Sequence, residues 1–211
     1  MSKNADTPLR NKESNTTSKG YERAGAILDV ARVLLANHGY AALSMRSVAL
    51  RLGVSLSNVQ HYYPSRDALI EALLVQTFDR YQAGIDERVA QLGKGARLEL
   101  FKAVIDYFLD DLRDPISCGL FFEISALANR HAYAAQIFDK MMTRARKTLR
   151  NLIKDIAPHM TPRQCEIRGA LIVSQMIGTM LFISDARPRH AELKGLLQEA
   201  NAAVMRIAFA A

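Results

Sequence analysis

Two short helical segments joined by a glycine turn are the feature that most constrains the fold of this chain. The stretch from Leu43 to Arg66 reads LSMRSVALRLGVSLSNVQHYYPSR. Ser44 is a suitable N-cap for a first helix, and Gly53 can end that helix, because glycine tolerates the left-handed backbone that a sharp turn needs. Ser55 or Ser57 can cap the second helix. The spacing therefore predicts a helix-turn-helix.

The outer face of the second predicted helix carries no carboxylate. Its side chains are apolar, hydroxyl, amide, imidazole or phenol groups, on Leu56, Ser57, Asn58, Gln60, His61 and Tyr62. Such polar groups hydrogen-bond base edges and phosphates, and an amide pairs bidentately with adenine in the major groove. An ordinary solvated helix is the alternative, but such faces in this chain carry acids, as Asp79 and Glu87 do further on. The face therefore favours nucleic acid.

Most of the net positive charge lies in the same third of the chain. Through Arg66 there are nine Lys and Arg against four Asp and Glu, out of 28 and 21 in the 211 residues. The remainder is nearly neutral. This asymmetry is typical of a basic nucleic-acid-binding head on a sensing or dimerising body.

Four motifs around the turn carry a family resemblance. They are Asn37-His38-Gly39-Tyr40, Ser44-Met45-Arg46-Ser47-Val48-Ala49, Gly53-Val54-Ser55 and Tyr62-Tyr63-Pro64-Ser65-Arg66-Asp67-Ala68-Leu69. With them, the segment from about Tyr21 to Leu74 resembles the N-terminal DNA-binding domain of the TetR family of bacterial transcriptional regulators. Gln60 stands where that family usually has a phosphate-binding tyrosine, and Arg66 stands where it usually has lysine. Arginine keeps the charge, whereas Gln60 is available to read a base instead.

The resemblance implies double-stranded DNA as the partner, bound at a palindromic operator by a homodimer. A symmetric reader places two recognition helices about one DNA turn, or a multiple of it, apart. We expect bases to be faced by Arg46, Ser57, Asn58, Gln60 and His61, and phosphates to be held by Ser44, Tyr62 and Arg66. Ser55 and Leu56 complete the predicted DNA-binding set.

The rest of the chain shows helical periodicity and no alternating strand pattern, so the expected fold class is all-α. Helices are predicted over Tyr21 to His38, from about Asp67 to the loop Gly93-Lys94-Gly95, and over Ala96 to Leu112, Cys118 to Arg130, Tyr133 to Ile156, Pro162 to about Asp185 and Arg189 to about Phe209. The expected organisation is a disordered basic arm over 1–19, a three-helix helix-turn-helix domain over 20–66, and a helical effector-binding and dimerisation domain over 67–211. The arm is either a flexible tail without a binding role or a segment that contacts DNA through Lys12 and Lys19.

The last two predicted helices carry small and apolar residues on broad faces. They either complete the core of one chain or form a dimer interface. The family resemblance implies the interface, for which we predict Ala170, Val173, Ile177, Leu181, Leu193, Leu197, Ala200 and Val204.

A small-molecule effector site in the body is also implied by the resemblance. The residues predicted for it are mainly aromatic or methionine: Phe78, Tyr107, Phe108, Phe121, Phe122, Glu123, Met141 and Met176. Core packing explains most of these equally well. Glu123 interrupts an apolar run, so its carboxylate needs a partner, either an arginine such as Arg130 or Arg168 or a cationic or hydrogen-bonding effector.

Catalytic and metal-binding patterns are missing from the sequence. The five histidines and two cysteines, Cys118 and Cys165, have no metal-ligand or disulfide spacing, and there is no glycine-rich phosphate loop or nucleophile elbow. We therefore expect no enzyme activity, no metal and no cofactor. The apolar run from Ala170 to Ile183 is too short to span a bilayer and no signal peptide is evident, which predicts a cytoplasmic protein without membrane contact.

A rival function remains compatible with the sequence. The chain would then be a helical small-molecule carrier or a protein-interaction module whose basic end binds something other than duplex DNA. Sequence-specific, steeply salt-dependent DNA binding separates the regulator from this rival.

Overall fold

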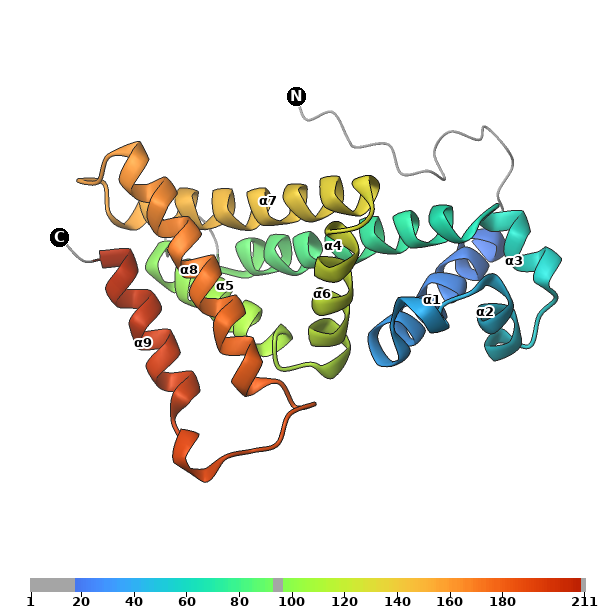
Figure 1. The fold of residues 1–211 in the computed structure, drawn as a ribbon. Coiled ribbons are helices and arrows are strands. Elements are labelled where there is room, and N and C mark those ends of the chain that lie inside the picture. The colour runs from blue at the N-terminus through green and yellow to red at the C-terminus, as the bar shows by residue number, and fades with distance from the viewer. Residues whose placement is uncertain (1–17, 93–96, 210–211) are drawn as a thin grey trace.

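The computed structural model describes residues 18–92 and 97–209, and within these ranges the chain is built from helices (Figure 1). Their bounds are α1 Ser18–Ala42, α2 Met45–Leu52, α3 Leu56–Tyr62, α4 Arg66–Leu92, α5 Arg97–Asp111, α6 Pro115–Ala128, α7 Ala132–Ile156, α8 Pro162–Ile183, a short 3-10 helix Ala191–Leu193, and α9 Leu196–Phe209. The all-α prediction is confirmed. The predicted arm, apart from Ser18 and Lys19 at the start of α1, and the loop Gly93-Lys94-Gly95 lie outside the described residues.

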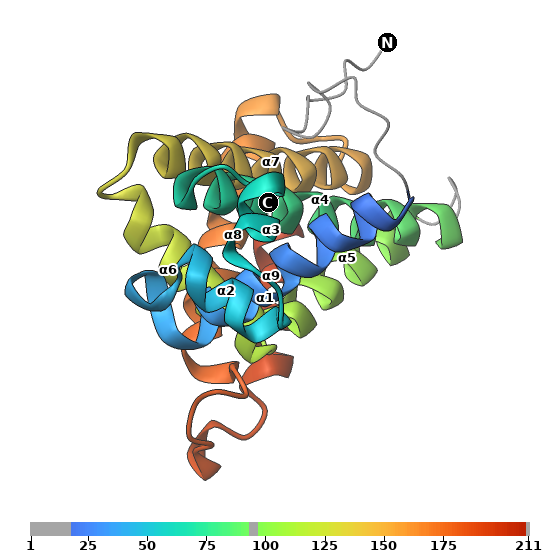
Figure 2. The ribbon, with the colours of Figure 1, turned by 90° about the vertical axis from the view of Figure 1, so that its right-hand side faces the viewer.

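The helices form a head and a body at opposite ends of the molecule. Helices α1, α2 and α3 gather at one end, and α8 and α9 lie at the other (Figure 1). Helix α4 runs from the head into the body, where it packs on α5 and α7. In the view turned by 90°, the three head helices face the reader with the body behind them (Figure 2).

The turn between α2 and α3 follows the sequence signals. Ser44 caps α2, accepting a hydrogen bond from the Ser47 N–H at 3.0 Å while the Ser47 hydroxyl accepts from the Ser44 N–H at 2.9 Å. Gly53 ends α2 in the left-handed region with φ of 64°. Ser55 caps α3 by accepting from the Asn58 N–H at 3.2 Å, so Ser55 rather than Ser57 is the cap.

Three predicted element boundaries are wrong, each for a local reason. Helix α6 starts at Pro115 rather than Cys118, because the Asp114 carboxylate caps the Ser117 N–H. The first helix continues past Gly39, where the backbone kinks at φ of 74°, to Ala42. The last predicted helix is split, because Gly195 adopts φ of 92° between the 3-10 helix and α9.

Helix α8 is longer than its apolar run suggested. By length and composition, its 22 residues qualify as a possible membrane span. In the structure, however, this helix packs against α7 and α9 and buries Ile172, Met176 and Met180 in the body core. It also carries Glu166 and Arg168 in its first half. These features suit a helix of a folded core.

The core of the head does not stop at the predicted boundary near residue 66. Buried side chains of α1, α2 and α3 form one cluster with Leu69 and Ile70 of α4 and with Leu120 and Ile124 of α6. Helix α6 comes unusually close to α1, because a Cβ atom at Gly119 would lie 2.5 Å from the Ala36 carbonyl oxygen. Head and body are thus joined by shared packing.

Gly119→Ala tests this close contact. The added methyl would meet backbone, which cannot swing aside, so we expect a loss of about 1–3 kcal/mol in the free energy of unfolding measured with urea. Gly25→Ala in α1 is the control, because a Cβ there meets nothing within 4 Å. That control should be neutral or stabilising by about 0.5–1 kcal/mol. Equal stability of the two variants would contradict the packing described.

Candidate functional site

Helix α3 is anchored by its inner face and offers its outer face to solvent. Val59 is fully buried, and Tyr63 is 3% exposed with its hydroxyl donating to the Ala24 carbonyl at 3.2 Å. Burial raises the pKa of Tyr63 to about 12, so the phenol keeps its proton at neutral pH. Ser57, Gln60 and His61 are exposed on the other face. The anchor fixes which side chains point outward.

Most of the predicted base-facing residues are exposed. Arg46 is exposed on α2, and Ser57, Gln60 and His61 are exposed on α3. Asn58 is half-buried, and its Oδ1 atom has no hydrogen-bond partner among the described residues. A large apolar side chain that the sequence reasoning missed, Leu50, is 83% exposed on α2.

The residues predicted to hold phosphates are less available. The hydroxyls of Ser44 and Ser55 are engaged as helix caps, and Tyr62 is half-buried with its ring centre 5.1 Å from the His61 ring centre. The Arg66 guanidinium lies 3.7 Å from the centre of the Tyr40 ring and donates to the Tyr40 carbonyl. Arg66 therefore supports the junction of α1 and α4 in this conformation.

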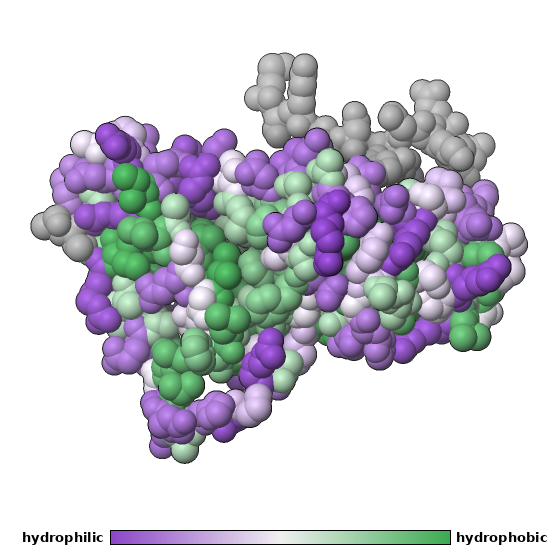
Figure 3. All heavy atoms as spheres, viewed as in Figure 1, coloured by the Kyte–Doolittle hydropathy of each residue, from purple (hydrophilic) through white to green (hydrophobic). Residues whose placement is uncertain are grey.

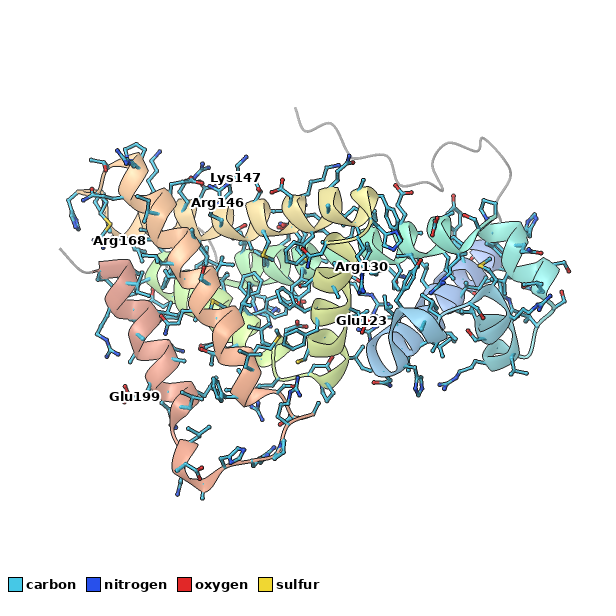
Figure 4. The ribbon with its side chains drawn as sticks, viewed as in Figure 1. Glu123, Arg130, Arg146, Lys147, Arg168 and Glu199 are labelled. Atoms are coloured by element: carbon cyan, nitrogen blue, oxygen red, sulfur yellow. The ribbon has the colours of Figure 1, made fainter. Side chains whose placement is uncertain are left out.

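Glu123 occupies a different place from the one predicted. Its carboxylate accepts a hydrogen bond from the Tyr40 backbone N–H at 2.9 Å, at the kink of α1 (Figure 4). Arg168 lies far away on α8 and donates instead to the Ile207 carbonyl at 3.1 Å. The partner of this half-buried carboxylate is thus a backbone N–H of the head, and Glu123 does not line the body cavity described below.

The body contains a cavity of about 150 Å³ between α1, α4, α5, α6, α7 and α8. Six of the residues predicted for an effector site line it: Phe78, Tyr107, Phe108, Phe121, Met141 and Met176. Phe122, like Glu123, does not. Tyr81, another aromatic residue, also lines the cavity, as do three polar residues that the prediction omitted: Ser117, Asp111 and Arg32. The sequence gives no sign that these three lie together, because they belong to different helices.

Asp111 is the acidic group of the cavity wall. Its carboxylate accepts hydrogen bonds from the Tyr81 hydroxyl and, at 3.1 Å, from the Ser117 hydroxyl. Burial raises the pKa of the Asp111 carboxyl, although both hydrogen bonds and the charge of Arg32 act to lower it. Burial, with the nearby Asp111 charge, also raises the pKa of Tyr81. The three side chains tie α4, α5 and α6 together.

The predicted dimer residues differ in how far they are exposed. Val204 and Ala200 are buried within the single chain, while Val173 and Ile177 line the cavity. Ala170, Leu193 and Leu197 are half-buried, and Leu181 is 49% exposed. Three large apolar side chains that the prediction missed are, like Leu181, exposed on α8: Ile167 at 50%, Leu171 at 52% and Phe182 at 59%. We call these four residues of α8 the α8 stripe; apolar surface gathers over this helix in Figure 3.

The geometry defines a class of protein: a helix-turn-helix head joined to a helical body that contains a cavity. Residues 27–73 match the family model described as bacterial regulatory proteins, tetR family. The head of this chain thus matches the DNA-binding domain of the TetR family.

Curated relatives match through about half of their length. An uncharacterized HTH-type transcriptional regulator in the dhlA 5′ region of Xanthobacter autotrophicus is 34% identical over 106 residues, which cover 50% of this chain and 52% of the relative. The HTH-type transcriptional repressor LfrR of Mycolicibacterium smegmatis is 36% identical over 104 residues, covering 49% and 52%. The chain thus spans about half the length of the curated relatives it matches.

Solved structures extend the likeness to nearly the whole chain. A TetR transcription regulator from Haloarcula marismortui superposes with a TM-score of 0.71 at 18% sequence identity, over 89% of this chain and 97% of that one. At this identity the likeness concerns the fold alone. It confirms the architecture of helix-turn-helix head and helical body.

The raised pKa of Asp111 makes stability depend on pH. The folded protein holds this proton to higher pH than the unfolded chain does, so folding becomes less favourable as pH rises through the interval between the two pKa values. Asp111→Asn removes that ionisation. We expect urea unfolding to show the variant gaining stability relative to the wild type as pH rises from the acidic range to neutrality. A pH-independent difference would contradict this account.

Proposed function

We propose that this protein is a sequence-specific DNA-binding transcriptional repressor. The observation that carries the proposal is the outward face of α3, held by Val59 and Tyr63, within a stretch from Val30 to Arg66 that contains no Asp or Glu. A carboxylate-free face with an amide, an imidazole and a nearby arginine suits base edges and phosphates. A related protein carries the name of a repressor, which favours repression over activation.

The proposal includes a homodimer acting on a palindromic site in the cytoplasm, where the DNA lies. The α8 stripe is an apolar surface, and its exposure to water is unfavourable. Contact with a second copy of the chain would bury the stripe on both chains at once. This surface lies at the opposite end of the molecule from α3, as Figure 1 shows. In a dimer joined through this surface, the two heads would lie apart from each other, so that each α3 could enter one of two successive major grooves.

The body cavity is proposed as the effector site. A small molecule bound among Phe78, Phe108 and Phe121 would contact α4 and α6, both of which also pack in the core of the head. A ligand shifts an equilibrium only through its different affinity for two conformations. We propose that, in the ligand-bound conformation, the distance between the two heads no longer fits the operator.

Replacing the exposed amide and imidazole of α3 tests the DNA contact. We expect Gln60→Ala with His61→Ala to weaken operator binding about 30-fold or more, because each of the two lost base contacts costs about 1–3 kcal/mol. Gel shifts on genomic fragments selected by the wild-type protein provide the measurement. Binding should also weaken steeply with salt, since phosphate contacts release counterions.

The matched control exchanges the same residue types elsewhere. Gln91 of α4 and His159, before α8, are both exposed and far from α3 in sequence. Gln91→Ala with His159→Ala should bind as the wild type does. If both double variants bind the selected fragments equally, or if the wild type shows no sequence preference, the repressor proposal fails.

Charged substitutions on the α8 stripe test the dimer. We expect Leu171→Glu with Phe182→Glu to yield a folded monomer in sedimentation velocity, because two like charges per chain would face each other in the interface. Val89→Glu is the control, since Val89 is also 45% exposed but lies on α4. A monomeric wild type, or a dimeric double variant, would exclude this interface.

A further inference from the structure

An arginine of the head reaches into the cavity of the body. Arg32 belongs to α1, yet it lines the cavity together with residues of α4 to α8. Its Nε atom is buried and has no hydrogen-bond partner among the described residues. Its guanidinium also forms no ion pair within 4.0 Å in the described part of the chain. A buried donor without an acceptor costs free energy that a ligand acceptor would recover.

The other arginines of the cavity wall are already engaged. Arg80 is exposed and pairs with Asp29. The Arg144 guanidinium lies 4.7 Å from the centre of the Phe78 ring. The residues that line the cavity thus include three arginines, counting Arg32, and one acidic residue, Asp111. The lining therefore carries a net positive charge. This balance favours a ligand that carries negative charge.

The cavity offers fewer free acceptor groups and ring faces to a cationic ligand. The carboxylate of Asp111 already accepts from the Tyr81 and Ser117 hydroxyls. One aromatic ring, Phe78, is covered by Arg144, and Arg88 lies 4.0 Å from the centre of the Tyr107 ring. The ring faces that would attract an ammonium group are thus partly occupied by guanidinium groups of the protein.

We propose that the cavity binds a small apolar carboxylic acid in its anionic form, with the carboxylate paired to Arg32 and the apolar part among the phenylalanines and methionines. A volume of about 150 Å³ suits a molecule the size of one substituted ring or a short alkyl chain. The inference names the chemical class of the effector and so rests on the proposed function. Because Arg32 belongs to α1, the ligand would touch the DNA-binding head directly.

Calorimetric titration of the purified full chain tests the class of ligand. Benzoate, benzamide and benzylamine have nearly the same shape and differ in charge, and hexanoate supplies an alkyl carboxylate. We expect one of the two carboxylates to bind, benzamide to bind about 10-fold or more weakly than benzoate if benzoate is the binder, and benzylamine not to bind. Preference for benzylamine, or no binding of either carboxylate, overturns the proposal.

Two variants on the same helix test the role of Arg32. Arg32→Gln should weaken carboxylate binding about 10-fold or more, whereas Arg23→Gln, at an exposed position of α1, should leave it unchanged. Should Arg32→Gln not fold, Arg32→Lys keeps the charge but loses the Nε donor. It should bind the carboxylate more weakly than the wild type does, and wild-type affinity in Arg32→Lys or Arg32→Gln overturns the proposal.

Gel shifts without ligand separate this inference from the proposed function. Sequence-specific DNA binding without carboxylate binding would overturn only the ligand class. Carboxylate binding that depends on Arg32, in a protein with no sequence preference for DNA, would support the cavity assignment and reject the repressor.

Discussion

The close contact between α1 and α6 is the constraint on which the arrangement of head and body depends. Gly119 lets the α6 backbone approach the Ala36 carbonyl, and no larger residue fits without a shift. A few residues further along α6, the Glu123 carboxylate accepts from the Tyr40 N–H, where the kink at Gly39 changes the direction of α1. A hydrogen bond to a charged acceptor contributes about 1.5–3 kcal/mol, enough to favour one orientation of the head. The position of the head thus depends on α6, a helix of the body.

The same contact places the head beside the cavity. Helix α6 contributes Leu120 and Ile124 both to the core of the head and to the cavity wall. Helix α1 contributes Arg32 to that wall, and Arg66 holds the end of α1 through Tyr40. A change in the shape of the cavity would therefore act on side chains that also position α3. No separate linker is needed for such coupling, because the two cores share residues.

The helix-turn-helix could be predicted almost completely, because its signals are local. Ser44, Gly53 and Ser55 act on backbone groups within a few residues of themselves, so the sequence spacing fixes their roles. Arg66 and Glu123 show where such reasoning stops. Arg66 was predicted to hold a phosphate and Glu123 to need a partner, yet both contact Tyr40, which lies 26 and 83 residues away along the chain. Contacts over such separations are set by packing of whole helices.

By itself, the sequence determined the all-helical class, the turn, and which face of α3 is apolar, since each follows from periodicity and capping over a few residues. Only the tertiary structure decided which apolar residues of α8 and α9 remain on the surface: Val204 is buried, while Leu171 and Phe182 are exposed. It also decided that Arg32 and Asp111 share one cavity. Both outcomes depend on how neighbouring helices rotate and cross, and helical periodicity identifies an apolar face without saying what covers it.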